Sequence, residues 1–480
     1  MSRIDLTATR NLHESLRERF ERDPRRFVQA CQRAEARLAE RRVQFERTGR
    51  LATVPSALLL SGDSLATLAR LTERLHGLVE RALDWLLADP RRLARYFADH
   101  ARMFPYLVKT AGLPTWQGYA RYDVAVWPGG ELTVIELNTA CPAGFFHGGE
   151  VTAATRASLA ELGLTEADAF PSECSMDGER LVDFLLELET AAGVAPGLVG
   201  LVNDENELHN EMDPLIAAFA RRGRDARETP AAEIACDAAR DRPTHGGEPL
   251  SLSLNKIRIS TPDSPAWKWA AGFQQRYAGF LAAVTQGRMA SANNLAACAV
   301  AEDKGLLAVL ICQDFLDTLA AEDQQFLRDH IAPTYRLTND GQPAEIARRG
   351  AEILDARNDW VVKPANEGRG FRVTVGAAVD DRAWREACRV DPALPLVAQR
   401  RADLAQFPVA DATGQPAQGP HVRPMRLTLG LAVIGGRFAG VLSRVSASAV
   451  TNVGAGGALQ AALGEGESPI RRKPCDAPNL

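Results

Sequence analysis

Four polar side chains recur at short spacing in an otherwise apolar segment, residues 121–144, with the sequence RYDVAVWPGGELTVIELNTACPAG. They are Arg121, Asp123, Glu136 and Asn138. Two carboxylates beside an amide oxygen are hard ligands of the kind that Mg²⁺ binds, usually together with substrate phosphates and water. The segment therefore predicts a magnesium site, provided that its fold brings the four side chains together.

The pattern of the same segment predicts a β-hairpin that would do so. Residues 123–127 and 132–138 read as strands, and the Gly-Gly dipeptide between them suits a two-residue turn. Pairing across that turn places the two carboxylates opposite each other and Arg121 opposite Asn138, all on one face because the strand period is two. The plainer alternative is an ion-paired sheet face in which Arg121 neutralises both acids.

Two lysines farther along the chain have the surroundings of phosphate-binding residues. Lys363 ends an apolar strand in VVKPANEGRG, and Gly368 and Gly370 in the following loop would let the backbone approach a ligand closely. Lys304 stands at the start of a predicted helix in EDKGLLAVL. The plain alternatives are a solvated hairpin loop for the first lysine and a surface position for the second.

Composition limits the class of protein and its partners. The chain of 480 residues is long enough for two or three domains, and a net charge of -5 with a pI near 6.0 argues against a nucleic-acid partner. The eight cysteines show no CxxC spacing and are expected to be reduced thiols. The N-terminus has no apolar core of signal-peptide type, and no run reaches the about 18 apolar residues of a membrane span. We therefore expect a cytoplasmic protein without a membrane partner.

Periodicity divides the chain into segments of different predicted structure. We expect a helical subdomain at 1–112, an α/β segment with the hairpin at 113–195, a doubly wound βα layer at 196–262, a further α/β unit at 263–463 and a frayed tail at 464–480. The predicted fold class is α/β with α+β features.

Taken together, these motifs resemble those of the ATP-grasp superfamily, whose members activate a carboxylate as an acyl phosphate and couple it to an amine. The motifs are E-L-N, an R-x-D whose aspartate lies thirteen residues before the glutamate, D-K before an apolar helix, V-K-P with a glycine loop, and V-A-Q. Here the acidic strand precedes the lysines, whereas it follows them in ordinary members. That order is similar to the circularly permuted branch, which includes glutathionylspermidine synthetase, and the ATP-binding motifs are similar to those of glutathione synthetases. The resemblance spans about 110–460 and implies a permuted ATP-grasp fold with a Rossmann-like pre-ATP-grasp layer and an N-terminal helical region.

The resemblance also implies roles for individual residues. Asp123, Glu136 and Asn138 would ligate Mg²⁺, Arg121 would face the transferred phosphoryl group, and Arg444 would contact phosphate and the acyl intermediate. The residues expected to bind ATP are Lys304, Lys363, Gly368, Arg369, Gly370, the adenine hinge Val397, Ala398 and Gln399, and the loop residues Asn452, Gly456 and Gly457. For that last loop a mobile surface segment is the bland alternative.

The function implied is that of an ATP-dependent carboxylate–amine ligase, with ATP and Mg²⁺ as cofactors and a small-molecule carboxylate and an amine as substrates. Two alternatives use the same site: a non-catalytic nucleotide-binding or scaffolding protein, and a small-molecule phosphotransferase. A serine hydrolase, suggested by GDSL at 62–65, is disfavoured because no histidine follows an aspartate at the D-x-x-H spacing. The acid, the amine, any catalytic base and a homodimer are left open.

Overall fold

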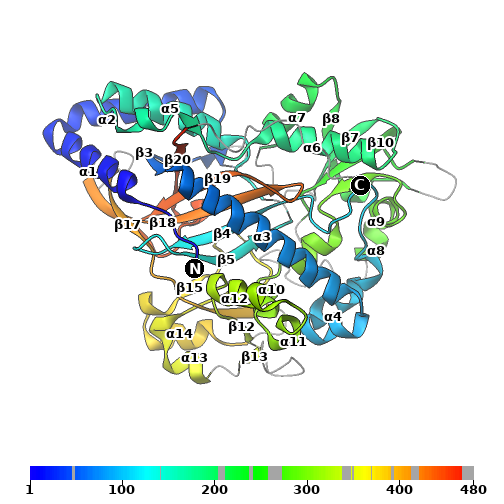
Figure 1. Ribbon diagram of the computed structural model, residues 1–480. Helices are drawn as coiled ribbons and strands as arrows, with labels where there is room; N and C mark the ends of the chain where they lie inside the picture. The colour runs from blue at the N-terminus through cyan, green and yellow to red at the C-terminus, as the bar shows by residue number, and fades with distance from the viewer. Residues whose placement is uncertain are drawn as a thin grey trace.

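The protein is a mixed α/β structure built on several sheets, shown as a computed structural model in Figure 1. The structure describes residues 1–45, 49–140, 142–203, 211–236, 242–257, 273–337, 347–348, 351–368, 370–390, 394–411 and 421–466. Among these residues, no helix has the length and apolar character needed to cross a bilayer.

The largest sheet has eight strands in the order β3-β20-β19-β18-β4-β5, with β17 against β18 and β6 against β20. Its strands are β3 (Thr53–Leu60), β4 (Tyr119–Val126), β5 (Leu132–Asn138), β6 (Ser172–Glu173), β17 (Gln406–Asp411), β18 (His421–Ile434), β19 (Arg437–Ser446) and β20 (Ala458–Gly464). Neighbours are antiparallel except for β3 and β20. Because β4 pairs with β18, one sheet unites segments that lie about 300 residues apart in the chain.

The first 112 residues are mostly helical, as expected, but they also supply a strand to this sheet. Their helices are α1 (Thr7–Arg22), α2 (Pro24–Glu40), α3 (Gly62–Leu87), α4 (Pro90–Tyr96) and the 3₁₀ segment Ala98–Tyr106. In β3, Leu58 and Leu60 pack in the same cluster as α3, while Ala57 and Leu59 pack in that of α1 and α5 (His147–Glu161). A strand covered on both faces has no polar alternation, so its apolar run cannot be told from a helix by periodicity.

A second sheet is parallel in its main strands and has the order β11-β10-β7-β8, with the short β9 antiparallel to β10. Its elements are α6 (Gly178–Ala191), β7 (Leu198–Asn203), α7 (Met212–Arg221), β8 (Ala226–Pro230), β9 (Thr244–His245), β10 (Glu248–Asn255), α8 (Phe273–Arg276), α9 (Ala278–Thr285) and β11 (Ala290–Ala292). The strand β7 and the helix α7 follow one another within the range 196–262, where a βα layer was expected. The sheet extends past 262, where we expected it to end, because β11 adds a strand beside β10.

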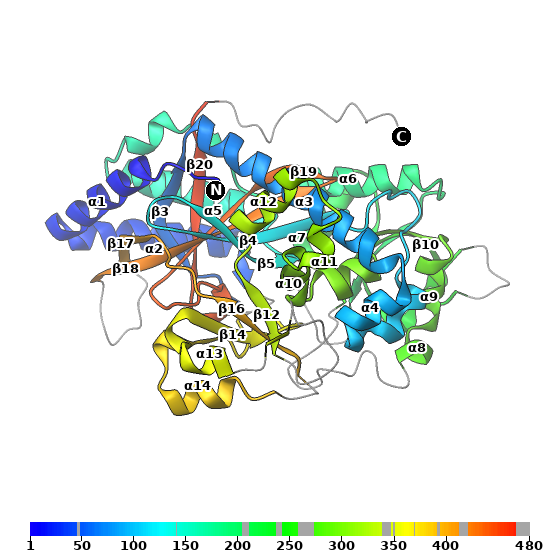
Figure 2. The same ribbon diagram turned by 60° about the horizontal axis from the view of Figure 1, so that its bottom comes forward.

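A third sheet, of five strands in the order β13-β12-β16-β14-β15, forms a smaller unit below the large sheet (Figures 1 and 2). Its strands and helices are β12 (Thr334–Leu337), β13 (Ala347–Arg348), α13 (Ala351–Asp355), β14 (Trp360–Pro364), β15 (Thr374–Val375), α14 (Asp381–Ala387) and β16 (Leu396–Arg400). The predicted strand, glycine loop and strand around Lys363 are confirmed, since Val361 pairs with Val375. Ile353, Trp360 and Trp384 form the core of this unit.

Short helices connect the parallel sheet to this small unit. They are the π-helical turn Ala297–Ala301, α10 (Gly305–Leu310), α11 (Gln313–Leu316) and α12 (Ala321–His330). Every residue from Gly305 to Leu310 is buried, so Lys304 begins a helix in the interior of the protein.

Candidate functional site

The predicted hairpin is present with the predicted residue pairs, but its turn is longer than expected and a bulge compensates for the extra turn residue. Asp123 lies opposite Glu136 and Arg121 opposite Asn138. The turn is longer than the two residues expected, because Trp127 N–H donates to the Glu131 carbonyl at 2.9 Å and leaves a three-residue loop at 128–130. A bulge at Ile135, between the pairs Val124–Val134 and Asp123–Glu136, restores the register.

Asp123 is held between two guanidinium groups. Arg121 Nε lies 2.9 Å from Asp123 Oδ1, and Arg444 Nη2 lies 2.8 Å from Oδ2. Burial alone would raise the pKa of this carboxyl, but the two arginines outweigh burial and hold the pKa below its ordinary value. Gly430, opposite Asp123 on β18, leaves room for Arg121, since a Cβ there would lie 2.6 Å from Arg121 Cδ.

Glu136 pairs with Lys304. Lys304 Nζ lies 2.9 Å from Glu136 Oε1 and donates a 2.5 Å hydrogen bond to the Glu367 carbonyl. Lys304 N–H donates to the Ala365 carbonyl at 3.0 Å, so the loop after Lys363 holds both ends of this lysine. Burial would raise the pKa of Glu136, but the charges of Lys304 and Lys363 lower it.

Asn138 is half-buried beyond this pair. Its Nδ2 is buried and has no hydrogen-bond partner among the described residues. An amide oxygen beside two carboxylates is a ligand of the type that a hard cation binds.

Lys363 reaches across from the small sheet to the hairpin. Its Nζ donates to the Ile135 carbonyl at 2.9 Å and to Gln399 Oε1 at 3.0 Å. Gln399 Nε2 in turn donates to Thr334 Oγ1 at 2.9 Å. Burial lowers the pKa of Lys363 to about 8; the nearby charge of Lys304 acts in the same direction, while Glu136 opposes it.

Most of these side chains line one cleft between the large sheet and the small sheet, with about 1050 Å³ of empty space including its open mouth, but Arg121 and Asn138 are not among its described lining residues. The predicted site residues among its lining are Asp123, Glu136, Lys304, Lys363, Gly370, Gln399, Arg444 and Asn452. Among the described residues, six basic and four acidic side chains line it, so it favours an anion. Its apolar part includes Val361, Val373, Val375 and Leu404.

Val397 and Ala398, expected as the adenine hinge, lie in β16, the middle strand of the small sheet. Val397 and Ala398 pair with β12 on one side and β14 on the other, so their backbone groups are committed to the sheet. Neither residue lines the cleft. The residues that follow this strand, 401–404 between β16 and β17, do line the cleft. The sequence pattern predicted the strand correctly. A strand that is paired on both sides has no free backbone groups left to bind adenine.

The two glycine elements differ in their relation to the cleft. Gly370 has φ 75° and lines it, whereas Gly368 does not, and Arg369 lies outside the described residues. The Asn452 side chain accepts a 2.9 Å hydrogen bond from Gly454 N–H and caps a short turn. Gly456 and Gly457 shape that turn without lining the cleft: Gly456 has φ 89°, and a Cβ on Gly457 would lie 2.3 Å from the Thr451 carbonyl.

Sequence reasoning missed Glu302, which stands two residues before Lys304. Its Oε2 accepts hydrogen bonds from Thr139 N–H at 2.5 Å and Ala140 N–H at 2.8 Å, immediately after the acidic strand. Burial raises the pKa of this carboxyl despite those bonds. The two adjacent acidic residues before Lys304 could have drawn attention to this position. The contact of Glu302 with the hairpin loop could not be predicted, because it joins residues 162 and 163 positions apart.

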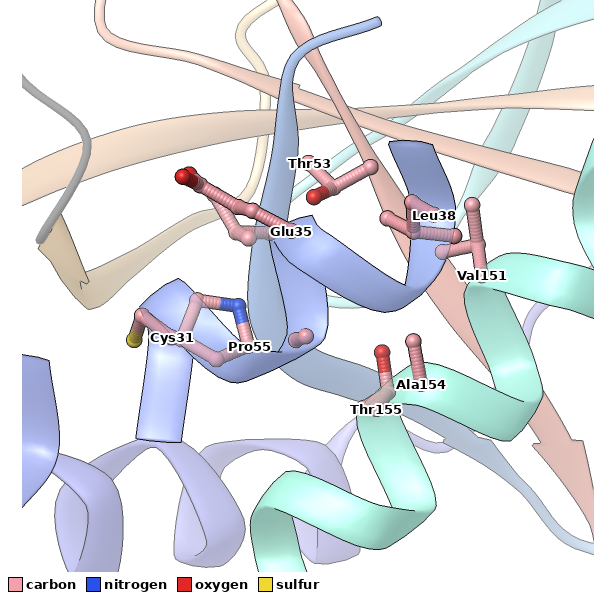
Figure 3. Close-up of a pocket in the computed structure, with 10 residues that line it drawn as sticks. Cys31, Glu35, Leu38, Thr53, Pro55, Val151, Ala154 and Thr155 are labelled. Atoms are coloured by element: carbon pink, nitrogen blue, oxygen red, sulfur yellow. The ribbon is translucent and has the colours of Figure 1, made fainter. Parts of the chain in front are cut away.

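A second, smaller hollow lies between α2, β3 and α5 (Figure 3), with about 300 Å³ of empty space including open solvent. Its lining is mainly apolar, including Leu38, Pro55 and Val151. Glu35 is its one charged lining residue, so it offers no place for a phosphate.

No protein-family model matches the sequence, and a search of curated proteins returns no match. The fold is similar to that of a solved glutathione synthetase-like effector from Globodera pallida in its apo form. The TM-score is 0.61 at 10% identity, over 92% of this chain and 97% of the effector. Weaker likenesses are to a RimK-domain ATP-grasp protein from Sphaerobacter thermophilus (TM-score 0.26, 16% identity, 52% and 91% covered) and to D-cycloserine synthetase DcsG (0.24, 15%, 51% and 91%). The effector comparison shows a shared fold, and the other two scores are too low to support an argument.

Proposed function

We propose that this protein is an ATP-dependent carboxylate–amine ligase of the ATP-grasp type, which forms an amide bond through an acyl phosphate. The observation that carries the proposal is the cleft, where Lys304 and Lys363 face the acids and Arg444 of the large sheet. The fold shared with a glutathione synthetase-like effector supports it.

Chain order supports a circular permutation relative to the order of motifs in ordinary ATP-grasp proteins. The hairpin that carries the acids precedes the small sheet, yet its strand β4 pairs with β18, which follows the small sheet. The large sheet is therefore built from both sides of an inserted unit. In this proposal the parallel sheet is the Rossmann-like pre-ATP-grasp layer, and the first 112 residues form an N-terminal cover.

The cleft suggests how ATP would lie. The adenine ring suits the apolar part between Val361, Val375 and Leu404, with the backbone of 401–404 supplying hydrogen bonds. The phosphates would then extend toward Lys363 and Lys304. This orientation puts the γ-phosphoryl group toward the hairpin.

The residues present suit Mg²⁺, which the Asp123 and Glu136 carboxylates and the amide oxygen of Asn138 would hold. All three supply oxygen ligands, and Asn138 Nδ2 has no hydrogen-bond partner within the part of the chain that the structure describes. In the structure both carboxylates are ion-paired with Arg121, Arg444 and Lys304. When bound, the ion would neutralise charge on the phosphates.

The surplus of basic side chains explains how the cleft would drive the reaction. A carboxylate oxygen attacks the γ-phosphorus and ADP leaves; the amine nitrogen then attacks the carbonyl carbon, phosphate leaves and the nitrogen loses a proton. The first step brings two anions together, so Arg121, Arg444 and Lys363 serve by neutralising charge and fixing positions. ATP would draw Arg121, Arg444 and Lys304 from the carboxylates, which frees the carboxylates for the metal.

The test is release of ADP with pairs drawn from amino acids, short peptides and polyamines, with products read by mass. A ligase needs both an acid and an amine for ADP release and yields a product of their summed mass less water. ADP release with one compound and a phosphorylated product would indicate a phosphotransferase. Binding of ATP without turnover across the panel would indicate the non-catalytic alternative.

A further inference from the structure

Four consecutive backbone N–H groups converge on one buried carboxylate at the start of α5. Gly144 and Phe145 donate to Glu211 Oε2 at 2.8 and 3.2 Å, and Phe146 and His147 donate to Oε1 at 2.7 and 3.2 Å. No local side chain caps this helix of fifteen residues. Residues 144–147 thus form an anion nest, and a carboxylate from another layer of the protein fills it.

The nest has further features of a binding site for an anion. His147 is 8% exposed, and its Nε2 is buried without a hydrogen-bond partner among the described residues. Burial would raise the pKa of the Glu211 carboxyl, but its electrostatic interactions with His147 and with Lys256, which is 3% exposed, lower it. A structural cap needs one or two backbone donors, whereas this carboxylate has four donors and two basic neighbours.

Glu211 adopts a strained backbone conformation to reach the nest. Its φ is 61°, in the left-handed region that residues with a Cβ rarely adopt. Gly144, with φ 114°, has no Cβ to meet Leu442, which would lie 3.0 Å away. Glu211 and Gly144, which meet in this contact, therefore both have a positive φ, a backbone conformation that an ordinary helix end does not require at its capping side chain.

One peptide group joins the nest to the ion pair of Arg121 with Asp123. The Ala143 carbonyl accepts a 2.7 Å hydrogen bond from Arg121 Nη1, and the Gly144 N–H of the same peptide donates to Glu211. Arg121 in turn pairs with Asp123. An anion in the nest is thus one peptide away from the residue placed at the transferred phosphoryl group.

We propose that residues 144–147 form a carboxylate-binding site whose resident ligand is Glu211, and that a free organic carboxylate can take the place of this side chain. The ligand class is the carboxylate of a small organic acid or peptide. Replacement would release the link between α5, which packs on the large sheet, and α7 of the parallel layer. The inference rests on the nest alone and stands or falls separately from the ligase proposal.

Chemical rescue tests the proposal. Glu211→Ala removes a methylene and a carboxylate, which together have the size of acetate. The melting temperature of this variant should fall by several degrees, and sodium acetate raised to about 100 mM should restore at least half of the loss, while sodium chloride at equal ionic strength should not. If the variant does not fold, the measurement becomes refolding yield, which acetate should raise and chloride should not.

Two variants serve as controls. Glu211→Gln keeps the nest filled with a neutral amide and should show no acetate effect. Asp177→Ala removes an ordinary cap, a carboxylate that accepts one 3.1 Å hydrogen bond from Arg180 N–H at the start of α6, and should not be rescued. An acetate response that is absent in Glu211→Ala, or equal in it and Asp177→Ala, would overturn the proposal.

Discussion

Lys363 donates a 2.9 Å hydrogen bond to the carbonyl of Ile135, the residue that bulges out of β5. A bulge leaves its extra residue out of the strand pairing, so this carbonyl is free to accept from a side chain. The next residue is Glu136. The irregularity in the hairpin therefore links the lysine of the small sheet to the acids of the large sheet.

The pKa of Lys363 predicts a pH limit for nucleotide binding. Burial lowers this pKa to about 8, so we expect ATP affinity to fall as the pH rises through 8 and the ammonium loses its charge. Lys363→Met should bind ATP at least about tenfold more weakly at pH 7, a loss of about 1.4 kcal/mol, and show no such fall. Calorimetric titration with ATP between pH 6.5 and 9.5 measures the loss of affinity and its dependence on pH. The surface substitution Lys109→Met is the control.

The same shift has a consequence for stability. Between pH 8 and the ordinary value of 10.5 the unfolded lysine binds a proton that the folded one has released, so this group makes the free energy of unfolding rise with pH. The rise amounts to about 3 kcal/mol and should be absent in Lys363→Met. Urea unfolding at pH 7 and 10 would show it, and an identical pH dependence in both proteins would count against the assignment.

Glu136→Gln tests the metal assignment. The substitution keeps the volume of a half-buried side chain but removes the negative charge that faces Lys304, so ATP turnover should fall about 10²–10³-fold. Glu131→Gln is the matched control, because Glu131 lies on the same hairpin but pairs only loosely with Arg3 on the surface. Turnover is read as ADP release and folding as melting temperature; normal turnover in Glu136→Gln would refute the assignment.

Ala402→Trp tests the linker as the adenine contact. A large side chain in 401–404 would fill the apolar part of the cleft beside Val361, so ATP affinity should fall at least about tenfold while pyrophosphate affinity stays the same. The control is Ala378→Trp, at an exposed position of the small unit that does not line the cleft. Equal losses for ATP and pyrophosphate would mean a general distortion of the cleft.

His100 belongs to a buried charge network that adjoins Lys304. Its Nε2 lies 3.0 Å from Asp303 Oδ2, and Arg336 bonds both Asp303 and Asp99. Burial opposes its protonation, but the charges of Asp99 and Asp303 prevail and raise the pKa of His100 above 6.5.

Because the folded pKa is the higher one, His100 stabilises the protein below pH 6.5, and this contribution is lost as the pH rises through the folded pKa. The free energy of unfolding, measured in urea from pH 5.5 to 8.5, should therefore depend less on pH in His100→Gln than in the wild type. His245→Gln, at a histidine that pairs with Glu233 near the surface, is the control. A slope unchanged by His100→Gln would exclude this role.

Local pattern was enough to predict the hairpin pairs and to single out Lys304, Lys363 and Gly370, which line the cleft. Strand alternation requires Asp123 and Glu136 to share a face, and the glycine loop after Lys363 predicts a strand on either side. The longer turn and the bulge escaped prediction because their effects on the register cancel. A sequence with either one alone would have put Glu136 on the opposite face.

What could not be predicted depends on contacts between distant segments. The pairing of Lys304 with Glu136 joins residues 168 positions apart, and nothing near Val397 indicates that strands would flank it on both sides. The strand β3 was not predicted either, because its pairing also depends on a distant segment. Its apolar run has the composition of a helix until β20 is known to lie beside it.

The pairing of β3 with β20 also bears on how the chain is made. β3 is the outermost strand of the large sheet, and β20 is its one described neighbour within it, so its hydrogen-bonding edge stays unmatched until about 400 further residues have been synthesised. At about 5–20 residues per second this interval is about 20–80 s. During that time the ribosome-bound chain carries an apolar strand with two open edges, a template for aggregation. We expect the nascent protein to depend on chaperones that shield residues 53–60 until translation is nearly complete.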